Sequence, residues 1–298
     1  PLFLKSDITI ELQEGAHLLG NTDRNKYPIL PGMTLLTDES DDYNLGSWEG
    51  NPLDCFASII TGVEVSNVNI IGKGIIDGNA QNGDWWVDVR TKRIAWRPRG
   101  VFLVRCSNIT FEGITVTNTP SWNLHPYFSN NIRFIDMKLI SPKVSPNTDG
   151  CDPESCKNVL IENCTFDTGD DCIAIKSGRN EDGRKWNIPS ENIIVRGCMM
   201  RNGHGGVVIG SEISGGYRNL FVEDCRMDSP NLDRVIRIKT STCRGGLIEN
   251  VFVRNVTVGQ CREAVLRINL QYENREKCKR GFDPIVRNVH LKNVTCEK

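Results

Sequence analysis

A short segment recurs eight times along the chain, and its spacing limits the folds that the chain can adopt. Each copy reads Asn, apolar, any residue, apolar, two further residues, and then usually an apolar residue or Cys. Successive copies lie 23 to 41 residues apart and begin at Asn67, Asn108, Asn131, Asn158, Asn192, Asn219, Asn250 and Asn288. A repeat of this length indicates a solenoid, in which each unit shares a buried core with its neighbours.

The residues inside the repeat predict strands. Apolar and polar residues alternate, and Val, Ile and Phe predominate, as in strands with one buried face. We therefore predict an all-β fold, a parallel β-helix with coils about 4.8 Å apart, forming a single domain over residues 1–298. The repeat Asn side chains are expected to stack at a turn and to hydrogen-bond from coil to coil.

Composition argues against several classes of protein. The 298 residues carry a formal net charge of -1, so no overall field favours nucleic acid or a membrane surface. No run of about 18 apolar residues could span a bilayer. Because the chain starts at Pro1 rather than Met, we interpret it as a trimmed or mature fragment. We expect a secreted or periplasmic monomer whose export signal is not part of this sequence.

Twelve cysteines are present, but no Cys-x-x-Cys pair occurs and His residues number only four, which argues against a zinc or iron–sulfur site. Cys164, Cys198 and Cys225 each lie six positions after a repeat Asn, where other copies carry Ile, Met or Val. They are therefore expected to be buried thiols. Whether six cysteines assigned to loops form disulfides stays open: Cys151, Cys156, Cys243, Cys261, Cys278 and Cys296.

A second strand precedes each repeat segment in the C-terminal half, and polar residues gather on it. We align its copies from Asp149, Asp171, Gly206, Val235 and Ala264. Because coils stack in register, Asp149 and Asp171 are expected to lie one above the other. The candidate site residues on or just before this strand are Asn147, Asp149, Asp170, Asp171, His204, Arg237 and Lys239.

These residue types are suited to the hydrolysis of an acidic sugar polymer. Carboxylates stacked about 5 Å apart repel one another, so at least one should have a raised pKa. Glycoside hydrolysis uses such a protonated carboxyl to protonate the leaving oxygen, while a carboxylate activates water or attacks directly. Arg237 and Lys239 alternate on one strand and can hold a substrate carboxylate. His204 can tune a carboxyl or contact the sugar.

Four motifs occur in a fixed order: Asn147-Thr148-Asp149-Gly150, Gly169-Asp170-Asp171-Cys172, Gly203-His204-Gly205 and Arg237-Ile238-Lys239. This ordered set resembles the polygalacturonases, glycoside hydrolase family 28, and the likeness covers essentially the whole chain. The resemblance implies a right-handed parallel β-helix. It also implies hydrolysis of α-1,4-linked galacturonate in pectin, with inversion at the anomeric carbon and without a metal or other cofactor.

The resemblance implies roles for individual residues as well. Asp170 matches the general acid of the family, and Asp149 and Asp171 match the pair that activates water. His204 matches the active-site histidine. The residues expected to bind substrate are Arg237, Lys239, Tyr272 and Asn147, of which the first two match the binders of the substrate carboxylate.

The polar stretch Ser177 to Glu191 has the composition of a loop. This stretch, the segment Gly203 to Gly210 and the sequence from Trp122 to Pro126 resemble exo-acting members of the family. We therefore predict release of galacturonate units from chain ends, and we place His125, Arg179 and Trp186 near the substrate.

Three alternatives remain open from the sequence. A pectate lyase on the same kind of solenoid would need Ca²⁺ held by carboxylates and a basic residue that abstracts a proton. A non-catalytic β-helix would only bind polysaccharide, although three carboxylates would repel an anionic ligand. A hydrolase of rhamnogalacturonan or another pectin backbone would use similar chemistry, but Arg237-Ile238-Lys239 favours galacturonate at the cleavage site.

Overall fold

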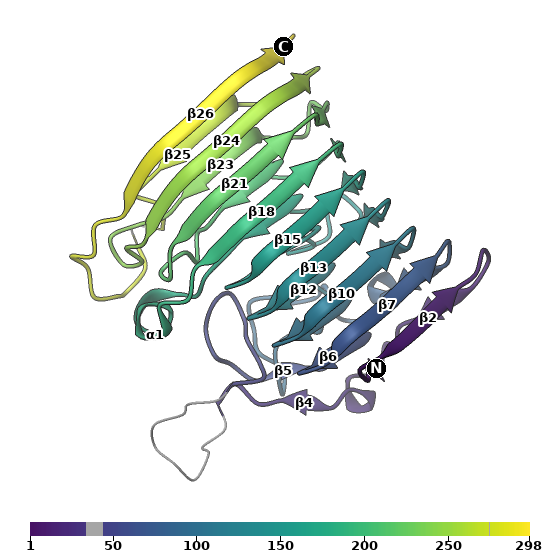
Figure 1. The fold of residues 1–298 in the computed structure, drawn as a ribbon. Helices are drawn as coiled ribbons and strands as arrows, with labels where there is room; N and C mark the ends of the chain where they lie inside the picture. Colours follow the sequence, from purple (N-terminus) through teal and green to yellow (C-terminus); the bar gives the residue numbers. More distant parts are fainter. Residues whose placement is uncertain (34–43, 274) are drawn as a thin grey trace.

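The structure, a computed structural model, describes residues 1–33, 44–273 and 275–298. In this part the chain winds into stacked coils, and all but one of the strand pairings between named strands are parallel. Figure 1 shows the long strands following one another in sequence order from the N-terminal end to the C-terminal end. The fold is therefore the right-handed parallel β-helix that the repeat and the resemblance predict.

The repeat segments form the first face of the solenoid. Its strands pair in consecutive register, so that Val68, Ile109 and Ile132 occupy one buried row and Ile70, Phe111 and Phe134 another. The strands are β2 (Ile8–Leu12), β7 (Ser66–Gly72), β10 (Ser107–Glu112), β13 (Asn130–Ile135), β15 (Lys157–Glu162), β18 (Ser190–Arg196), β21 (Tyr217–Glu223), β24 (Leu247–Val258) and β26 (Ile285–Cys296).

A second face follows in each coil after a tight bend. Because β24 runs unbroken through this bend, the two faces join into one 16-stranded sheet. The short strands of the second face are β3 (His17–Leu19), β8 (Ile75–Asp77), β11 (Thr115–Thr117), β14 (Lys138–Ile140), β16 (Thr165–Asp167), β19 (Met199–Met200) and β22 (Arg226–Met227).

The third face carries the second strand of the sequence repeat, and it forms two four-stranded sheets. Isolated bridges through Cys151 and Glu154 join these sheets into one continuous surface. The strands are β1 (Leu2–Phe3), β6 (Ile60–Val63), β9 (Val101–Val104) and β12 (Leu124–Tyr127), and then β17 (Ile173–Ile175), β20 (Val207–Ile209), β23 (Arg234–Lys239) and β25 (Ala264–Asn269).

The register of this third face corrects the alignment made from the sequence. Ile173 pairs with Val207, and Val207 pairs with Ile236. The positions that match Asp171 are therefore Gly205 and Arg234, one residue before the predicted Gly206 and Val235. The predicted stacking of Asp149 and Asp171 is confirmed, because Cys151 bridges Ile173 and each aspartate lies two residues earlier.

The repeat asparagines form a ladder, as predicted. Each has a left-handed backbone conformation, with φ between 54° and 63°. The amide Nδ2 of each ladder residue donates to Oδ1 of the residue one coil earlier, at distances between 2.8 and 3.2 Å. The ladder runs through Asp7, Asn67, Asn108, Asn131, Asn158, Asn192, Asn219, Asn250 and Asn288.

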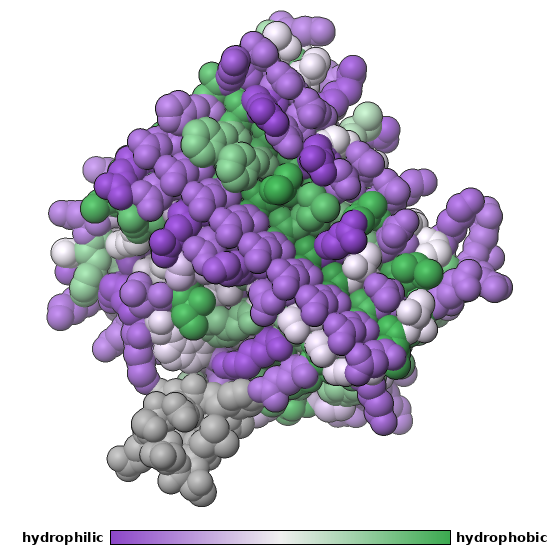
Figure 2. Space-filling view, in the orientation of Figure 1, coloured by the Kyte–Doolittle hydropathy of each residue, from purple (hydrophilic) through white to green (hydrophobic). Residues whose placement is uncertain are grey.

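One buried apolar cluster extends along the axis of the solenoid. Cys164, Cys198 and Cys225 are buried in it, as predicted. Cys151 is not a loop residue, because it bridges Leu124 and Ile173 and is completely buried in the same cluster. Among the described residues, the disulfide joins Cys243 and Cys278. The outer surface in Figure 2 is mostly hydrophilic, with a hydrophobic band across the long strands.

The stretch Ser177 to Glu191 is only partly the loop that its composition predicts, because it contains the helix α1 (Asn180–Trp186). Glu181 and Asp182 lie in its first turn and Arg184 and Lys185 in its last, which suits the helix dipole. The remaining elements are the antiparallel pair β4 (Ile29–Leu30) and β5 (Cys55–Phe56) and the 3₁₀ turns η1 (Arg24–Lys26) and η2 (Ala80–Asn82). No helix in the described ranges has the length and apolar character needed to traverse a bilayer.

Candidate active site

A cleft of 390 Å³ lies over the third face, where its polar residues gather. Eight residues that the sequence predicted for the site line it: Asn147, Asp149, Asp170, Asp171, His204, Arg237, Lys239 and Tyr272. A second hollow of 920 Å³ shares Asn147, Asp170 and His204 with the first and extends toward Trp96. Together the two hollows form a groove longer than the carboxylate cluster alone.

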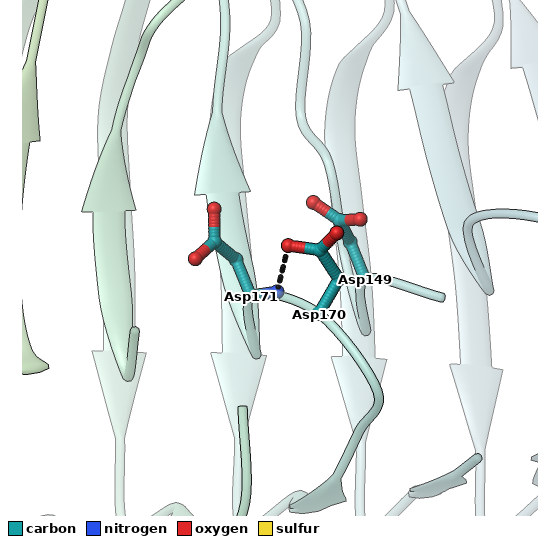
Figure 3. Close-up of side chains that lie close together, drawn as sticks. All are labelled: Asp149, Asp170 and Asp171. Atoms are coloured by element: carbon teal, nitrogen blue, oxygen red, sulfur yellow. Dashed lines mark hydrogen bonds between the residues drawn. The ribbon is translucent and has the colours of Figure 1, made fainter. Parts of the chain in front are cut away.

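The three aspartates predicted for the chemistry meet in this cleft. One carboxylate oxygen from each of Asp149, Asp170 and Asp171 lies within 4.8 Å of the others. Figure 3 shows the three side chains close together, with Asp149 and Asp171 on neighbouring coils and Asp170 drawn between them. The stacking of coils therefore places residues that are 22 positions apart in the sequence at one site.

Asp171 is held by cations from β23, two strands away on the same face. The Nζ of Lys239 donates to Oδ2 of Asp171 at 2.8 Å, and Arg237 Nη1 lies 3.9 Å from Oδ1. The Asp171 side chain is 1% exposed. Burial lowers the pKa of Lys239, but the charge of Asp171 outweighs this effect and holds it above its ordinary value.

Asp170 is bound by His204, which follows it at the matching position of the next coil. The two side chains meet at 3.0 Å through Nδ1 and Oδ1, and the backbone N–H of Asp171 also donates to Oδ1 at 2.9 Å. Burial raises the pKa of Asp170, but the hydrogen bond and charge of His204, with Lys239, hold it below its ordinary value. The same hydrogen bond raises the pKa of His204 despite its partial burial.

Asp149 has the raised pKa that crowded carboxylates were predicted to produce. Burial is the largest cause, followed by the negative charges of Asp152 and Asp170. Asp152, which the sequence reading did not single out, is completely buried nearby, and burial raises its pKa to about 8. The pKa values of Asp149 and Asp152 therefore lie above the ordinary aspartate value, and that of Asp170 lies below it.

Tyr272 and Asn147 form parts of the cleft wall. Arg237 and Lys239 lie over the ring of Tyr272, with their cationic centres 5.5 and 5.4 Å from the ring centroid. Asn147 Oδ1 accepts a hydrogen bond of 2.5 Å from Arg97. These contacts fix both side chains at the edge of the aspartate cluster.

His125 and Arg179 do not line this cleft. His125 is completely buried on the outward side of the third face, where its Nε2 lies 2.9 Å from Glu154. Arg179 lines the second hollow, where it pairs with Glu276 at 3.0 Å and with Glu49 at 3.3 Å. Their predicted contacts with substrate stay predictions.

Trp186, also predicted near the substrate, packs against Phe128 with ring centroids 4.9 Å apart. It lines a small separate hollow whose other residues include Gly178 and Ile188. The observed contact anchors α1 to the body of the solenoid.

The sequence reading missed an ion pair at the base of the cleft. Lys176 donates to Glu212 at 3.0 Å, and both side chains are less than 10% exposed. Both residues line the cleft, as do Glu49, Trp122, Ser211, Asp233, Arg234 and Glu273. Strand alternation could have indicated Lys176 from the sequence. This residue directly follows β17, at the position that pairs with Glu154.

The spacing of the three aspartate oxygens is one that a divalent cation could bridge. Asp171 is already paired with Lys239, however, and Asp170 with His204. Two of the three carboxylates therefore have cationic side chains as partners. This donor set fits acid–base chemistry better than a dedicated cation cage, in which carboxylates keep their lone pairs for the metal.

Comparison with known proteins agrees with this site. The chain matches the family model described as glycosyl hydrolases family 28 over residues 6–298. The chain belongs to this family. A probable polygalacturonase from Vitis vinifera is 33% identical over 86% of this chain and 50% of its own length. An endo-polygalacturonase from Pectobacterium parmentieri is 29% identical over 100% of this chain and 70% of its own.

The same fold is seen in the crystal structure of a hyperthermoactive exopolygalacturonase from Thermotoga maritima. It is 33% identical, superimposes with a TM-score of 0.85, and is matched over 99% of this chain and 70% of its own. The chain thus spans between half and 70% of the length of these three similar proteins.

Proposed function

We propose that this chain is a polygalacturonase that hydrolyses α-1,4-galacturonosyl linkages of pectin with inversion, and that it acts from chain ends. One observation carries the proposal: Arg237 and Lys239 line the same 390 Å³ cleft as the three aspartates. The cations suit a uronate carboxylate, and the carboxyls suit hydrolysis of its glycosidic bond.

Each aspartate has a proposed role. Asp170 donates a proton to the leaving oxygen, and Asp149 and Asp171 orient the water that attacks from the opposite side. Lys239 places its positive charge 2.8 Å from Asp171 Oδ2, beside the carboxylate that acts as base. In the free protein His204 favours the ionised form of Asp170, so Asp170 must gain a proton when the anionic substrate binds and displaces water.

Support for action at chain ends comes from the loops beside the cleft. Arg179, next to α1, ties Glu49 of an N-terminal loop to Glu276 of a C-terminal loop across the second hollow. Arg244 binds Glu273 and Glu276 in the same group. Loops connected in this way would restrict one direction of the groove, and the similar protein from Thermotoga maritima is an exopolygalacturonase.

The test is digestion of polygalacturonate with and without EDTA, followed by sizing of products over time. We expect activity to survive EDTA, to give no unsaturated product, and to release galacturonate or its dimer from the start. A mixed ladder of long oligomers early in the digestion would contradict exo action. New ultraviolet absorbance from an unsaturated product would instead support a lyase.

We further propose that the protein acts outside the cytoplasm, secreted or periplasmic, since its proposed substrate is a cell-wall polymer. Recovery of activity in the medium or the periplasmic fraction of the source cells would support this location, and recovery in the cytoplasm alone would contradict it. The expected monomeric state can be tested by light scattering after size exclusion.

A further inference from the structure

Beneath the cleft lies a second group of charged side chains that the proposed chemistry does not use. Asp152, Glu154 and Lys176 lie on the outward side of the third face, yet their exposure does not exceed 5%. Glu212 completes the group through its 3.0 Å bond to Lys176. Three buried carboxyls therefore share one lysine, and the further positive charge of Arg244 and Arg179 acts on Glu212.

Of the three buried carboxyls, Asp152 has the weakest set of hydrogen-bond and ion-pair partners. It is completely buried, and neither of its carboxylate oxygens has a hydrogen-bond donor among the described residues. Lys176 Nζ lies 3.5 Å from its Oδ1, but that nitrogen is already bound at 3.0 Å to Glu212. A buried carboxylate in this position would lack the hydrogen bonds that ionised groups need in a protein interior.

The neighbouring coils do not supply the missing donor. By register, His125 of β12 and Ala174 of β17 flank Asp152 on the two sides. Burial and the charges of Arg99 and Lys176 lower the pKa of His125 well below its ordinary value, so this side chain is neutral. His125 is also already bound to Glu154.

The remaining neighbour is Asp149. It lies three residues before Asp152 and is also buried, and hydrogen bonding to Asp149 opposes the effect of burial on the pKa of Asp152. Two carboxylates cannot hydrogen-bond, because neither has a proton to donate. The contact becomes a hydrogen bond only when one of the two carboxyls is protonated, as in pairs of carboxyls that share a proton.

We propose that Asp152 is a positioning residue of the active site, which shares one proton with Asp149 and thereby fixes the direction and charge of that cleft-facing carboxyl. Asp152 does not touch the substrate and acts only through Asp149. The proposal deepens the function proposed above, on which its kinetic readout rests. Its spectroscopic readout is independent of any activity.

The charged groups around the pair decide how it responds to pH. Asp170 and Asp171 add negative charge from the next coil, and Lys176 opposes them. Loss of the shared proton would leave four negative charges around the water position and repel a polyanionic substrate. Activity should then fall about tenfold for each pH unit above the apparent pKa of the pair.

The test replaces Asp152 with Asn, which keeps the shape and can donate to Asp149 but holds no shared proton. Infrared spectra of the proteins without substrate should show, in the wild type, a protonated-carboxyl band that disappears as pH passes about 8. This band should be missing in Asp152→Asn, whereas the band of Glu154, whose pKa burial raises to about 7, should remain. The alkaline limb of kcat should move to higher pH in the variant, while KM at the optimum changes little.

Glu154→Gln is the matched control. It removes a carboxyl of the same buried layer that contacts His125 rather than Asp149, and it should keep the alkaline limb of the wild type. A folded Asp152→Asn that keeps both the infrared band and the wild-type alkaline limb would overturn the proposal. If Asp152→Asn does not fold, Asp149→Asn serves instead, and the band of Asp152 should then disappear at lower pH than in the wild type. An unchanged band would refute proton sharing, even if the wild type proved inactive on polygalacturonate.

Discussion

Lys239 binds Asp171 across two coils of the solenoid, 68 residues away in sequence, with both side chains at least 90% buried. Replacing Lys239 by Met would leave the Asp171 carboxylate without its main partner. We expect a loss of about 3–5 kcal/mol in the free energy of unfolding, as for other broken buried pairs.

The same change should lower kcat/KM by about a hundredfold or more, because an active-site carboxylate and a substrate-binding cation are affected together. Urea unfolding and initial rates on polygalacturonate measure the two effects. Lys138→Met, on the exposed side of β14, is the control and should change neither. Wild-type activity in Lys239→Met would show that the ion pair is not part of the site.

Asp170 should take up a proton when an anionic ligand binds. Its pKa lies below the ordinary value in the free protein, whereas a general acid must be protonated. We expect uptake of up to about one proton per molecule when galacturonate, which cannot be cleaved, binds at mildly acidic pH. Calorimetric titration in buffers of different ionisation enthalpy measures this number.

Asp170→Asn is the control for proton uptake. It should bind galacturonate without taking up the proton and should reduce kcat by about 10²- to 10⁴-fold. Equal proton uptake in the wild type and in Asp170→Asn would assign the proton to another group and remove Asp170 from the acid role.

Glu212 should make the protein sensitive to acid. Burial raises the pKa of this carboxyl, but Lys176, Arg244 and Arg179 outweigh it and hold the pKa far below the ordinary 4.5. A carboxyl with a lowered folded pKa stabilises the protein above its unfolded pKa, and this contribution is lost as pH falls toward the folded pKa.

Glu212→Gln should therefore cost about 3–5 kcal/mol of unfolding free energy at neutral pH, with a smaller difference from the wild type below pH about 4. Chemical unfolding across this pH range measures the difference. Glu112→Gln, at an exposed position of β10, should have little effect. A difference between Glu212→Gln and the wild type that grew with acidity would contradict the sign of the predicted shift.

Substitution within the asparagine ladder separates the stability that comes from its hydrogen bonds from the stability that depends on its left-handed backbone conformation. Asn158 donates to Asn131, accepts from Asn192 and has a φ of 56°. Asn158→Ala loses both hydrogen bonds and replaces Asn, which tolerates the left-handed conformation, with a residue that does so less readily, so we expect a loss of about 2–3 kcal/mol. Asn158→Gly keeps the backbone free of strain and should lose about 1 kcal/mol less than Ala. Greater stability of the Ala variant than of the Gly variant, measured by urea unfolding, would rule out this division.

Periodicity was enough to predict the features that repeat. The Asn column predicted the fold, the ladder and the buried Cys164, and the 22-residue interval predicted that Asp149 and Asp171 meet. These predictions succeeded because coils in register turn a sequence interval into a spatial neighbour.

Features that depend on side-chain packing were not visible in the sequence. The sequence alignment placed Gly206 and Val235 at the position of Asp171, one residue after the correct Gly205 and Arg234. The small residues around Gly205 show no apolar alternation that could define the register. The low pKa of Asp170 depends on a 3.0 Å contact with His204, and the role proposed for Asp152 depends on its burial. No interval in the sequence predicts the distance between two side chains or the burial of one of them.

The constant spacing of the asparagine ladder contrasts with the uneven separations in sequence between its members, which range from 23 to 60 residues. Insertions and deletions between two ladder positions leave the positions themselves in place. Evolution can therefore exchange whole loops around the groove, and with them the polymer that it accepts, while the reacting carboxyls keep their positions. By the same reasoning, loops grafted from other family members offer a route to new substrate ranges that requires no redesign of the chemistry.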